Sequence, residues 1–420
     1  MTLRRTILLS MFSILVGIAP ATAAPAEVEG RHPVLMISID GLRPDAVLEA
    51  DSHGLRIPVL RSLLVEGAYA QAVVNVNPTV TNPNHTTLVT GVLPREHGIY
   101  NNRPFAASSK LPASYSLYSE IKAPTLWGAA KAAGVTTASM FWPVTAQARD
   151  IDINLSEGSS EDDRKIQDDA IGLIRERRPQ LLTLHFVSLD HDEHEFGPFS
   201  PQANATLERL DAMLGAIIAE ERKAYPDAVV AIVSDHGFSS LSHQMHLNAA
   251  LAQAGFITLS DGATPSVTGW TAFGWYVGGA AMVVLKDPKD QQTRARVEAY
   301  LQALANDPAN GIEGVHTRQE IEGLGLAPNV EFVVAFKAGY GMGNAMAGPL
   351  VTSAKGGAHG GFSTGALRPD MRSSFFITGP GVAAGKNLGV IDIRQIAPTL
   401  AQELKAALPS ARMPPLPIRR

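Results

Sequence analysis

The chain has 420 residues, of which 45% are hydrophobic and 18% are charged, and its formal net charge is −5. These values favour one large α/β domain or two modest domains, and they exclude general disorder. The negative charge argues against a protein that binds a nucleic-acid polymer over its whole surface. Because the sequence contains no cysteine, disulfides, thiolate metal ligands and a cysteine nucleophile are excluded, and a bound metal would need His, Asp, Glu or hydroxyl ligands.

The first 24 residues have the pattern of an export signal. Arg4 and Arg5 precede an apolar run from Ile7 to Ile18, and the small residues Ala21–Ala23 follow it. The run is shorter than the ~20 apolar residues that a membrane span needs, which disfavours a permanent anchor. We therefore expect cleavage near Ala24 and a periplasmic or secreted protein with no stable membrane span.

Four short apolar runs predict buried strands, and three of them run into an aspartate. They are Val34–Ile39 before Asp40, Leu181–Leu189 before Asp190, Ala228–Ser234 before Asp235, and Phe375–Thr378. Apolar residues at three- and four-residue spacing predict helices over Pro58–Glu66, Pro124–Ala133, Asp163–Arg177, Ala203–Ala224 and Thr293–Leu304. The alternation predicts a three-layer α/β/α sandwich with a central, mainly parallel sheet. Since ligands bind at the carboxyl ends of parallel strands, the three aspartates suggest one shared site.

The segment of about residues 260–350 differs in composition from the rest of the chain. It is rich in glycine, threonine and aromatic residues at its start, and residues 339–348 are again rich in glycine. We predict a small inserted or peripheral subregion within a single domain of residues 30–405. The proline-rich residues 406–420 predict an irregular C-terminal tail.

Six side chains near these strand ends suit a pair of metal ions. They are the carboxylates and imidazoles of Asp40, Asp190, His194, Asp235, His236 and His359. Zinc prefers such ligands and takes about four of them. Two zinc ions about 4 Å apart can clamp the attacking and leaving oxygens of an in-line phosphoryl transfer. The sequence therefore predicts a site for two Zn²⁺ ions with three protein ligands each, completed by a hydroxyl nucleophile and a substrate oxygen.

Several motifs resemble those of a known family. They are Pro78-Thr-Val-Thr81-Asn-Pro-Asn-His85, Thr90-Gly91, His97-Gly98, Ser234-Asp-His-Gly237, and His359-Gly360 with Gly379-Pro-Gly381. From about Val34 to Val382 the chain resembles the alkaline phosphatase superfamily and, within it, the type I phosphodiesterase/nucleotide pyrophosphatase family. This resemblance implies an alkaline phosphatase-like fold and a hydrolase domain.

The resemblance also implies roles for individual residues. Thr81 would be the nucleophile and Asn102 would bind a phosphoryl oxygen. One zinc would be held by Asp40, Asp235, His236 and Thr81, and the other by Asp190, His194 and His359. The implied reaction is hydrolysis of a phosphodiester or pyrophosphate bond through a phosphothreonine intermediate, on a small phosphorylated substrate. Metal coordination would lower the pKa of the threonine hydroxyl, and the backbone N–H of residue 82 would help to stabilise the phosphoryl oxygens.

Departures from the family pattern leave the substrate open. Asn82, which we expect to contact the substrate, stands where nucleotide-cleaving relatives usually carry an aromatic residue. The run Thr-Asn-Pro-Asn also resembles phosphonoacetate hydrolases, whose lysines hold the substrate carboxylate, and Lys122 and Lys131 are available here. No motif places a lysine or arginine at the phosphate, although Arg103 follows Asn102, so a diester or anhydride is favoured. The sequence is also compatible with a phosphomonoesterase and with a non-catalytic zinc-binding member of the fold.

Two further groups of residues surround the candidate site in the sequence. Glu193 stands where the family more often has glycine. Its neighbours His191, Asp192 and Glu195 are interpreted as a polar rim, and the alternative is that they orient the metal ligands. Five aromatic residues are candidates for lining a substrate pocket, although aromatic residues more often belong to a core: Phe141, Trp142, Trp270, Trp275 and Tyr276.

Overall fold

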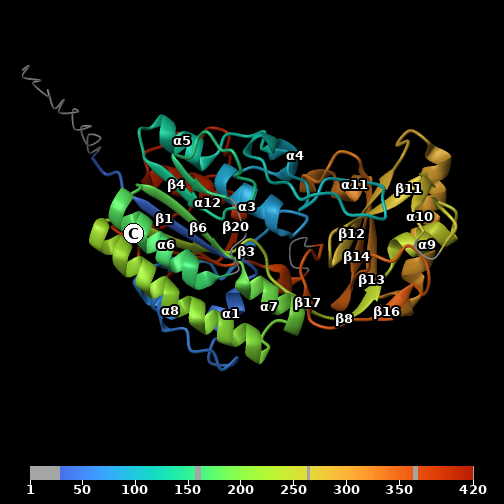
Figure 1. Cartoon of the computed structure of the whole chain (residues 1–420), viewed down its shortest axis with the longest axis horizontal. Helices are drawn as coiled ribbons and strands as arrows, with labels where there is room; N and C mark the ends of the chain where they lie inside the picture. The colour runs from blue at the N-terminus through green and yellow to red at the C-terminus, as the bar shows by residue number, and fades with distance from the viewer. Residues whose placement is uncertain (1–28, 157–161, 263–264, 363–367, 420) are drawn as a thin grey trace, which may run out of the picture.

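The computed structural model describes residues 29–156, 162–262, 265–362 and 368–419. The chain forms a large lobe with helices on both sides of a sheet and a smaller lobe rich in strands (Figure 1). The predicted export signal, residues 1–24, lies outside the described residues. Within the described ranges, no helix combines the length and the apolar character that crossing a membrane requires.

The large lobe is built on an eight-stranded sheet in the order β19-β2-β18-β7-β1-β6-β4-β5. The strands are β1 (Val34–Ile39), β2 (Ala68–Tyr69), β4 (Thr137–Met140), β5 (Ile153–Leu155), β6 (Leu181–Phe186), β7 (Val229–Val233), β18 (Phe375–Thr378) and β19 (Lys386–Asn387). The five strands from β7 to β5 are parallel, whereas β18 runs antiparallel to β7. This arrangement confirms the predicted mainly parallel sheet.

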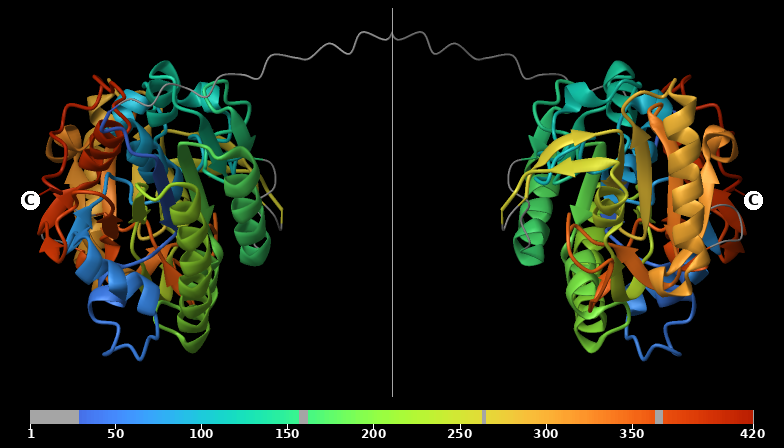
Figure 2. Two further views of the ribbon diagram at one scale, coloured as in Figure 1. Left: turned by 90° about the vertical axis from the view of Figure 1, so that its left-hand side faces the viewer. Right: turned by 90° about the vertical axis from the view of Figure 1, so that its right-hand side faces the viewer.

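Helices cover both faces of this sheet (Figures 1 and 2). Val34 and Met36 of β1 pack toward α3 (Thr81–Thr90), α5 (Leu126–Ala132) and α12 (Ile396–Glu403). Leu35 and Ile37 pack toward the opposite layer, formed by α1 (Pro44–Leu48), α2 (Pro58–Glu66), α6 (Asp163–Arg177) and α8 (Pro201–Ala224). Successive strand residues point to opposite faces, so a strand covered on both sides is apolar throughout. The three-layer sandwich predicted from the sequence is thus confirmed.

One of the predicted strands is too long. The apolar run Leu181–Leu189 was expected to lead as a strand into Asp190, but β6 ends at Phe186 and α7 (Ser188–Phe196) follows at once. Val187, with φ −112° and ψ −12°, turns the chain from the strand into the helix. Asp190 therefore lies in the first turn of a helix, and the polar residues that follow it belong to the same helix.

The smaller lobe contains an antiparallel sheet in the order β11-β12-β14-β13. Its strands are β11 (Ala272–Tyr276), β12 (Ala280–Leu285), β13 (Ile312–Thr317) and β14 (Val330–Phe336), and the hairpin β9 (Ile257–Leu259) and β10 (Val267–Trp270) precedes them. One face of the sheet packs against α9 (Leu247–Gln253) and α10 (Gln291–Asn306), and the short α11 (Arg318–Ile321) lies against the other. The predicted domain boundaries at about 260–350, 30–405 and 406–420 stay predictions.

Strand β8 joins the two lobes. β8 (Ser239–Met245) leaves the large lobe just after β7, and it pairs with β15 (Gly339–Met342), β16 (Val351–Ser353) and β17 (Gly357–Ala358). The chain returns to the large lobe after β17. Elsewhere in the large lobe, β3 (Ala72–Val74) pairs with β20 (Val390–Asp392), and α4 (Pro94–His97) follows α3. The segments on either side of the small lobe, at residues 234–238 and 357–361, are therefore brought to one place.

Glu221 in α8 gives the protein a pH-dependent stability. Its side chain is 1% exposed, neither carboxylate oxygen has a partner among the described residues, and burial raises its pKa to about 7 despite nearby Arg178. Because the folded-state pKa is raised, the stabilising protonated form is fully present below about pH 4.5 and is lost as pH rises through about 7.

We expect Glu221→Gln to remove this loss. Above pH 7 the free energy of unfolding of the variant should be about 2–3 kcal/mol higher than that of the wild type. Near pH 5 the two free energies of unfolding should be nearly equal. Urea unfolding at both pH values measures the difference. A variant that follows the wild-type pH dependence would contradict the assignment.

Candidate active site

Three neighbouring strands position the acidic residues of the site. Asp40 follows β1, and Asp235 follows β7, which lies beside β1 with Ser38 opposite Val233. Asp190 comes from α7, which follows β6 on the other side of β1. Because these strands are parallel, their carboxyl ends lie at one edge of the sheet. The three aspartates expected to share a site do converge.

The first predicted ligand group joins α7 to the segment after β17. Asp190 and His194 are four residues apart and therefore lie on one face of the helix, with His194 Nε2 3.6 Å from Asp190 Oδ2. His359 Nε2 lies 3.6 Å from Asp190 Oδ1. His194 Nδ1 donates to the carbonyl oxygen of Gly357 at 3.1 Å. A carbonyl oxygen only accepts, so the proton is on Nδ1 and the lone pair of His194 Nε2 faces the site.

The carboxylates and the imidazole of the second predicted ligand group, Asp40, Asp235 and His236, are buried. His236 Nε2 lies 3.3 Å from Asp40 Oδ1 and 3.1 Å from Asp235 Oδ2. His236 Nδ1 lies 3.2 Å from the carbonyl oxygen of Gly237, which again leaves the Nε2 lone pair toward the carboxylates. The ring of His236 stacks on that of His359 with centroids 3.9 Å apart, so the two groups adjoin.

A rigid loop brings Thr81 to this place. The side-chain amide of Asn84 donates to the carbonyl oxygens of Pro78 and Val80 at 3.0 Å, and its oxygen accepts the N–H of Val76 at 3.0 Å. Asn84 thus holds the loop that leads to the first turn of α3. Thr81 begins this helix and is half-buried, while the following residues are buried. The positive end of the helix dipole lies at this position, which favours a nearby anion.

Asn102 lies beside the Thr81 hydroxyl. Thr81 Oγ1 is 3.5 Å from His236 Nε2, and Asn102 Nδ2 donates to the same oxygen at 3.4 Å. The backbone N–H of Asn82 donates to Asn102 Oδ1 at 2.8 Å. This N–H was expected to face a phosphoryl oxygen. In the structure it orients the amide of Asn102 instead, so that the NH₂ group points to Thr81.

Sequence reasoning missed two histidines behind the ligand groups. His185 in β6 lies with Nε2 2.9 Å from Asp40 Oδ2 and Nδ1 3.1 Å from the carbonyl oxygen of Phe141. His85 in α3 contacts Ser38 Oγ at 2.9 Å through Nε2 and donates through Nδ1 to the carbonyl oxygen of Thr81 at 3.0 Å, and Nδ1 also lies 3.3 Å from Asp235 Oδ2. Together with Asp40 these two histidines are themselves close enough for a metal group. Since both ring nitrogens of each are already engaged, we interpret His185 as a partner that orients the Asp40 carboxylate and His85 as a support for the backbone of Thr81.

Burial dominates the electrostatics of the site. Burial, together with Asp235 and Asp190, raises the pKa of Asp40 well above its usual range. Burial alone would also raise the pKa of Asp235, but the adjoining imidazoles of His236 and His85 hold it well below the usual value. Burial lowers the pKa of His236 to about 4 and that of His359 well below its usual range. At neutral pH these imidazoles are therefore neutral, which is the form that binds metals.

Buried carboxylate oxygens without hydrogen-bond partners indicate whether metal ions fit this site. Asp40 Oδ1, Asp190 Oδ1 and Asp235 Oδ2 are buried oxygens with no hydrogen-bond partner among the described residues. Asp40 Oδ1 and Asp235 Oδ2 lie near His236 Nε2, and Asp190 Oδ1 lies near His359 Nε2. Buried carboxylate oxygens without partners are costly in the absence of a cation. The geometry groups Asp40 with Asp235 and His236, and Asp190 with His236 and His359. The residues present therefore suit metal ions with nitrogen and oxygen ligands.

The residues beside Asp190 differ in their surroundings. Glu193, interpreted from the sequence only as a departure from the family, is 5% exposed and has a buried oxygen without a partner among the described residues. Burial and Asp190 raise its pKa. Asp192 accepts a hydrogen bond from Thr206 of α8, so it fastens α7 to its neighbour and is not part of a free rim. His191 and Glu195 are exposed.

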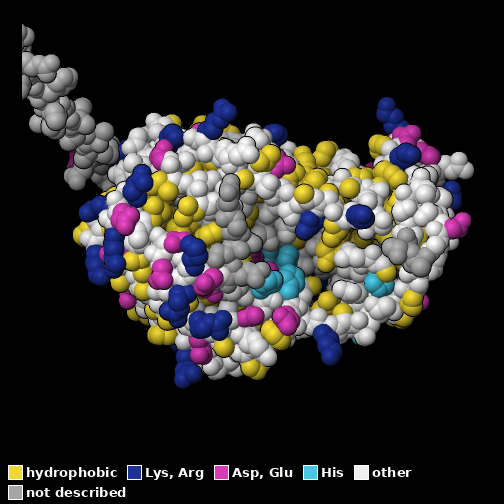
Figure 3. Space-filling view, in the orientation of Figure 1, with side chains coloured by type: hydrophobic (Ala, Val, Ile, Leu, Met, Phe, Trp, Pro, Cys, Tyr) yellow, Lys and Arg dark blue, Asp and Glu magenta, His cyan; other side chains and the backbone are white. Residues whose placement is uncertain are grey.

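Two cavities flank the site. The larger, of about 600 Å³, is lined by Asn102, His194 and His359 together with residues of the small lobe. Figure 3 shows histidine side chains gathered at a hollow between the lobes. The smaller, of about 250 Å³, is lined by Asn82 and Tyr115 among others. The side-chain amide of Asn82 donates to the carbonyl oxygens of Asn102 and Tyr115 at 3.2 Å, and its contact with a substrate stays a prediction.

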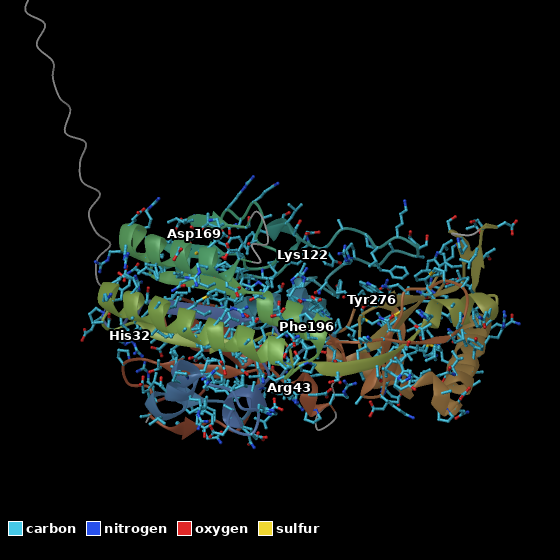
Figure 4. The ribbon with its side chains drawn as sticks, turned by 60° about the horizontal axis from the view of Figure 1, so that its bottom comes forward. His32, Arg43, Lys122, Asp169, Phe196 and Tyr276 are labelled. Atoms are coloured by element: carbon cyan, nitrogen blue, oxygen red, sulfur yellow. The ribbon has the colours of Figure 1, made fainter. Side chains whose placement is uncertain are left out.

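Four of the five candidate aromatic residues line these cavities. Trp275 and Tyr276 line the larger cavity, and Phe141 and Trp142 line the smaller one. Trp270 packs against Phe105 and Phe273 in the small lobe. Figure 4 shows Tyr276 on the small lobe, across from Phe196 at the end of α7.

The lysines considered for a substrate carboxylate lie elsewhere. Lys122 Nζ donates to the carbonyl oxygen of Ser119 at 2.8 Å, and Lys131 Nζ pairs with Asp152 at 2.9 Å. Neither lines either cavity.

The chain is similar in sequence to a known family of proteins. Residues 34–361 match the profile of the type I phosphodiesterase/nucleotide pyrophosphatase family. The chain is 30% identical over 234 residues to ectonucleotide pyrophosphatase/phosphodiesterase family member 1 of Homo sapiens, covering 51% of this chain and 24% of that protein. It is 27% identical over 249 residues to family member 7 of Mus musculus, covering 55% and 56% of the two chains.

A solved structure extends the likeness to the fold. The structure of human ectonucleotide pyrophosphatase/phosphodiesterase 5 superposes with a TM-score of 0.69 at 21% identity, covering 91% of this chain and 96% of that one. The chain thus shares an alkaline phosphatase-like fold with that protein. The matched region spans about a quarter of family member 1 and about half of family member 7.

Proposed function

Since the chain belongs to the type I phosphodiesterase/nucleotide pyrophosphatase family, we propose that it is an exported phosphoric ester hydrolase that cleaves phosphodiester or pyrophosphate bonds at a two-zinc site. One observation carries this proposal: the Thr81 hydroxyl lies between the amide of Asn102 and His236, where the two ligand groups adjoin. A purely structural metal site has no use for a hydroxyl and an amide directed at it.

The residues of the chain have distinct tasks in this proposal. When bound, the zinc ions supply positive charge that lowers the pKa of a contacting hydroxyl and balances the charge of phosphoryl oxygens. Asp40, Asp235 and His236 would hold one ion beside Thr81, and Asp190, His194 and His359 would hold the other. Thr81 Oγ1 attacks phosphorus and forms a phosphothreonine, which water then hydrolyses. The Asn102 NH₂ group donates to a phosphoryl oxygen.

The surroundings of Thr81 favour a diester over a monoester. The side chain directed at its hydroxyl is the neutral amide of Asn102, and the ion-pair partners of Asp40, Asp190 and Asp235 are histidines. A monoester carries one more negative charge than a diester, and no lysine or arginine among these contacts balances it.

Two p-nitrophenyl esters test the proposed reaction. We expect the zinc-loaded protein to hydrolyse bis-p-nitrophenyl phosphate with a kcat/KM at least about tenfold higher than that for p-nitrophenyl phosphate, a difference of about 1.4 kcal/mol. Absorbance of released p-nitrophenolate measures both reactions. A preference for the monoester would make the protein a phosphomonoesterase. Failure with both esters and with phosphonoacetate would favour a zinc-binding protein without catalysis.

Export is part of the same proposal. It is supported by the two arginines, the apolar run and the small residues of the first 24 positions. The N-terminal sequence of the protein recovered from the periplasm or medium would test it, with a start near Ala24 as the expected result.

A further inference from the structure

A buried phenylalanine lies beside histidines of both candidate ligand groups. Phe238 is located between His236 and β8, and its side chain is fully buried. Its ring centroid lies 4.8 Å from that of His194 and 5.4 Å from that of His359, with interplanar angles of 79° and 74°. The ring of His236 is the third neighbour, with centroids 6.1 Å apart. One hydrocarbon ring, which offers no ligand atom, thus packs among three candidate ligands.

The backbone of the site holds this ring on two sides. A Cβ added to Gly41 would lie 3.2 Å from Phe238 Cδ2, and one added to Gly357 would lie 2.9 Å from Phe238 Cδ1. Side chains at these two positions would crowd the ring, whereas glycine lets the backbone approach it. Gly41 follows the candidate ligand Asp40, and the carbonyl oxygen of Gly357 accepts the hydrogen bond from His194 Nδ1. The ring therefore lies between segments that carry ligands of the two groups.

The backbone of Phe238 is anchored as well. Arg43 Nη1 donates to the carbonyl oxygen of Phe238 at 2.9 Å. The same guanidinium forms an ion pair with Asp45 and lies over the ring of Phe199, with its Cζ 4.9 Å from the ring centroid. Because these contacts fix the guanidinium, they also fix the main chain of Phe238. The ring is therefore held against the histidines from its own backbone and from its surroundings.

The two ligand groups depend on this ring to different degrees. His236 Nε2 has two carboxylate oxygens within 3.3 Å, which hold the imidazole independently of the ring. His194 and His359 each have Nε2 at 3.6 Å from a single carboxylate, that of Asp190. The side chain of His194 is also 43% exposed. Packing against Phe238 is therefore a larger part of what orients the imidazoles of Asp190, His194 and His359, here called the Asp190 group.

We propose that Phe238 is a positioning residue that holds the two imidazoles of the Asp190 group in the orientation that binds a metal ion. A ligand that is oriented before the ion arrives loses less conformational freedom when the ion binds. This inference rests on the two-metal site of the proposed function, and it adds a residue that acts on the ion only through its ligands. It concerns the affinity for the ion in the absence of substrate.

Titration of the metal-free protein with Co²⁺ tests this role. The visible absorption of bound Co²⁺ reports each ligand group as it fills, and His194→Ala assigns the signals because it removes a ligand of the Asp190 group alone. In Phe238→Leu we expect the dissociation constant of the Asp190 group for Co²⁺ to rise about tenfold or more, and that of the other group to change by less than about threefold.

Two further variants separate positioning from general stability. In Phe238→Met a flexible side chain refills most of the lost volume, so most of the affinity should return. Phe332→Leu makes the same change at a fully buried position in the core of the small lobe, and it should lower Tm while both affinities stay at their wild-type values. Unchanged affinities in Phe238→Leu, equal losses in both groups, or the same selective loss in Phe332→Leu would overturn the proposal.

The absence of substrate separates this test from that of the hydrolase function. If the wild type hydrolyses neither p-nitrophenyl ester but Phe238→Leu weakens the Asp190 group selectively, the proposed reaction fails and the positioning role stands. If the wild type hydrolyses the diester and Phe238→Leu binds both ions as tightly as the wild type, the reaction stands and the positioning role fails. A wild type that binds no Co²⁺ would reject both.

Discussion

Thr81→Ala is expected to lower kcat/KM for bis-p-nitrophenyl phosphate by at least about 10³-fold. In the proposed reaction the hydroxyl of Thr81 attacks phosphorus, and it lies 3.5 Å from His236 Nε2 and 3.4 Å from Asn102 Nδ2. Removing it leaves the six candidate metal ligands in place. Steady-state kinetics measures the loss, and bound metal measured by mass spectrometry should remain near the wild-type content.

Thr81→Ser provides the matched control. Serine keeps the hydroxyl at the first position of α3 and lacks only the methyl group, so it should retain most of the activity that alanine loses. Rapid acid quenching during turnover should trap a phosphoryl group on residue 81 of the wild type. Activity in Thr81→Ala close to that of the wild type would show that another group, or water, attacks phosphorus directly.

Removal of metal is expected to abolish activity and to lower Tm by about 10 °C or more. The reason is the set of buried acceptors that face one another: Asp40 Oδ1, Asp190 Oδ1 and Asp235 Oδ2 have no hydrogen-bond partner among the described residues. A bound cation would compensate the cost of keeping these oxygens buried. Differential scanning calorimetry before and after dialysis against a chelator measures the change, and added Zn²⁺ should restore both properties.

Two variants make this thermal test specific. Thr81→Ala keeps the six candidate ligands and should lose the same Tm on chelation as the wild type. Asp235→Ala, which removes a fully buried ligand, should begin with a low Tm and change little further. An unchanged Tm in the chelated wild type, with metal shown to be absent, would mean that the buried acceptors are not a metal site.

Strands β1, β7 and β18 were predictable because each is largely apolar on both faces and is followed at once by a polar residue or glycine. Val34–Ile39 and Phe375–Thr378 match the observed strands, and Asp40 and Asp235 follow β1 and β7 as expected. Because the carboxyl ends of neighbouring parallel strands lie at one edge of the sheet, the residues that follow these strands are expected to lie close together. The candidate ligands could be placed near one another for that reason, although their roles stay predictions.

The other parts of the fold and of the candidate site depend on features that a single sequence does not reveal. An apolar run gives no sign of where a strand yields to a helix, so the end of β6 at Phe186 was missed. The spacing of Asp190 and His194 was the one local signal of a helix, since residues four apart share a helix face. His185 meets Asp40 only through the register of β6 against β1, with Ser38 opposite His185.

The stacked rings of His236 and His359 also hold together the two segments that connect the small lobe to the large lobe. His236 precedes β8, where the chain leaves the large lobe, and His359 follows β17, where it returns. The entropy of closing a loop grows only with the logarithm of its length. Insertions and deletions within this lobe should therefore cost little free energy of folding while the two rings stay in contact, so the lobe can change in length without moving the candidate ligands.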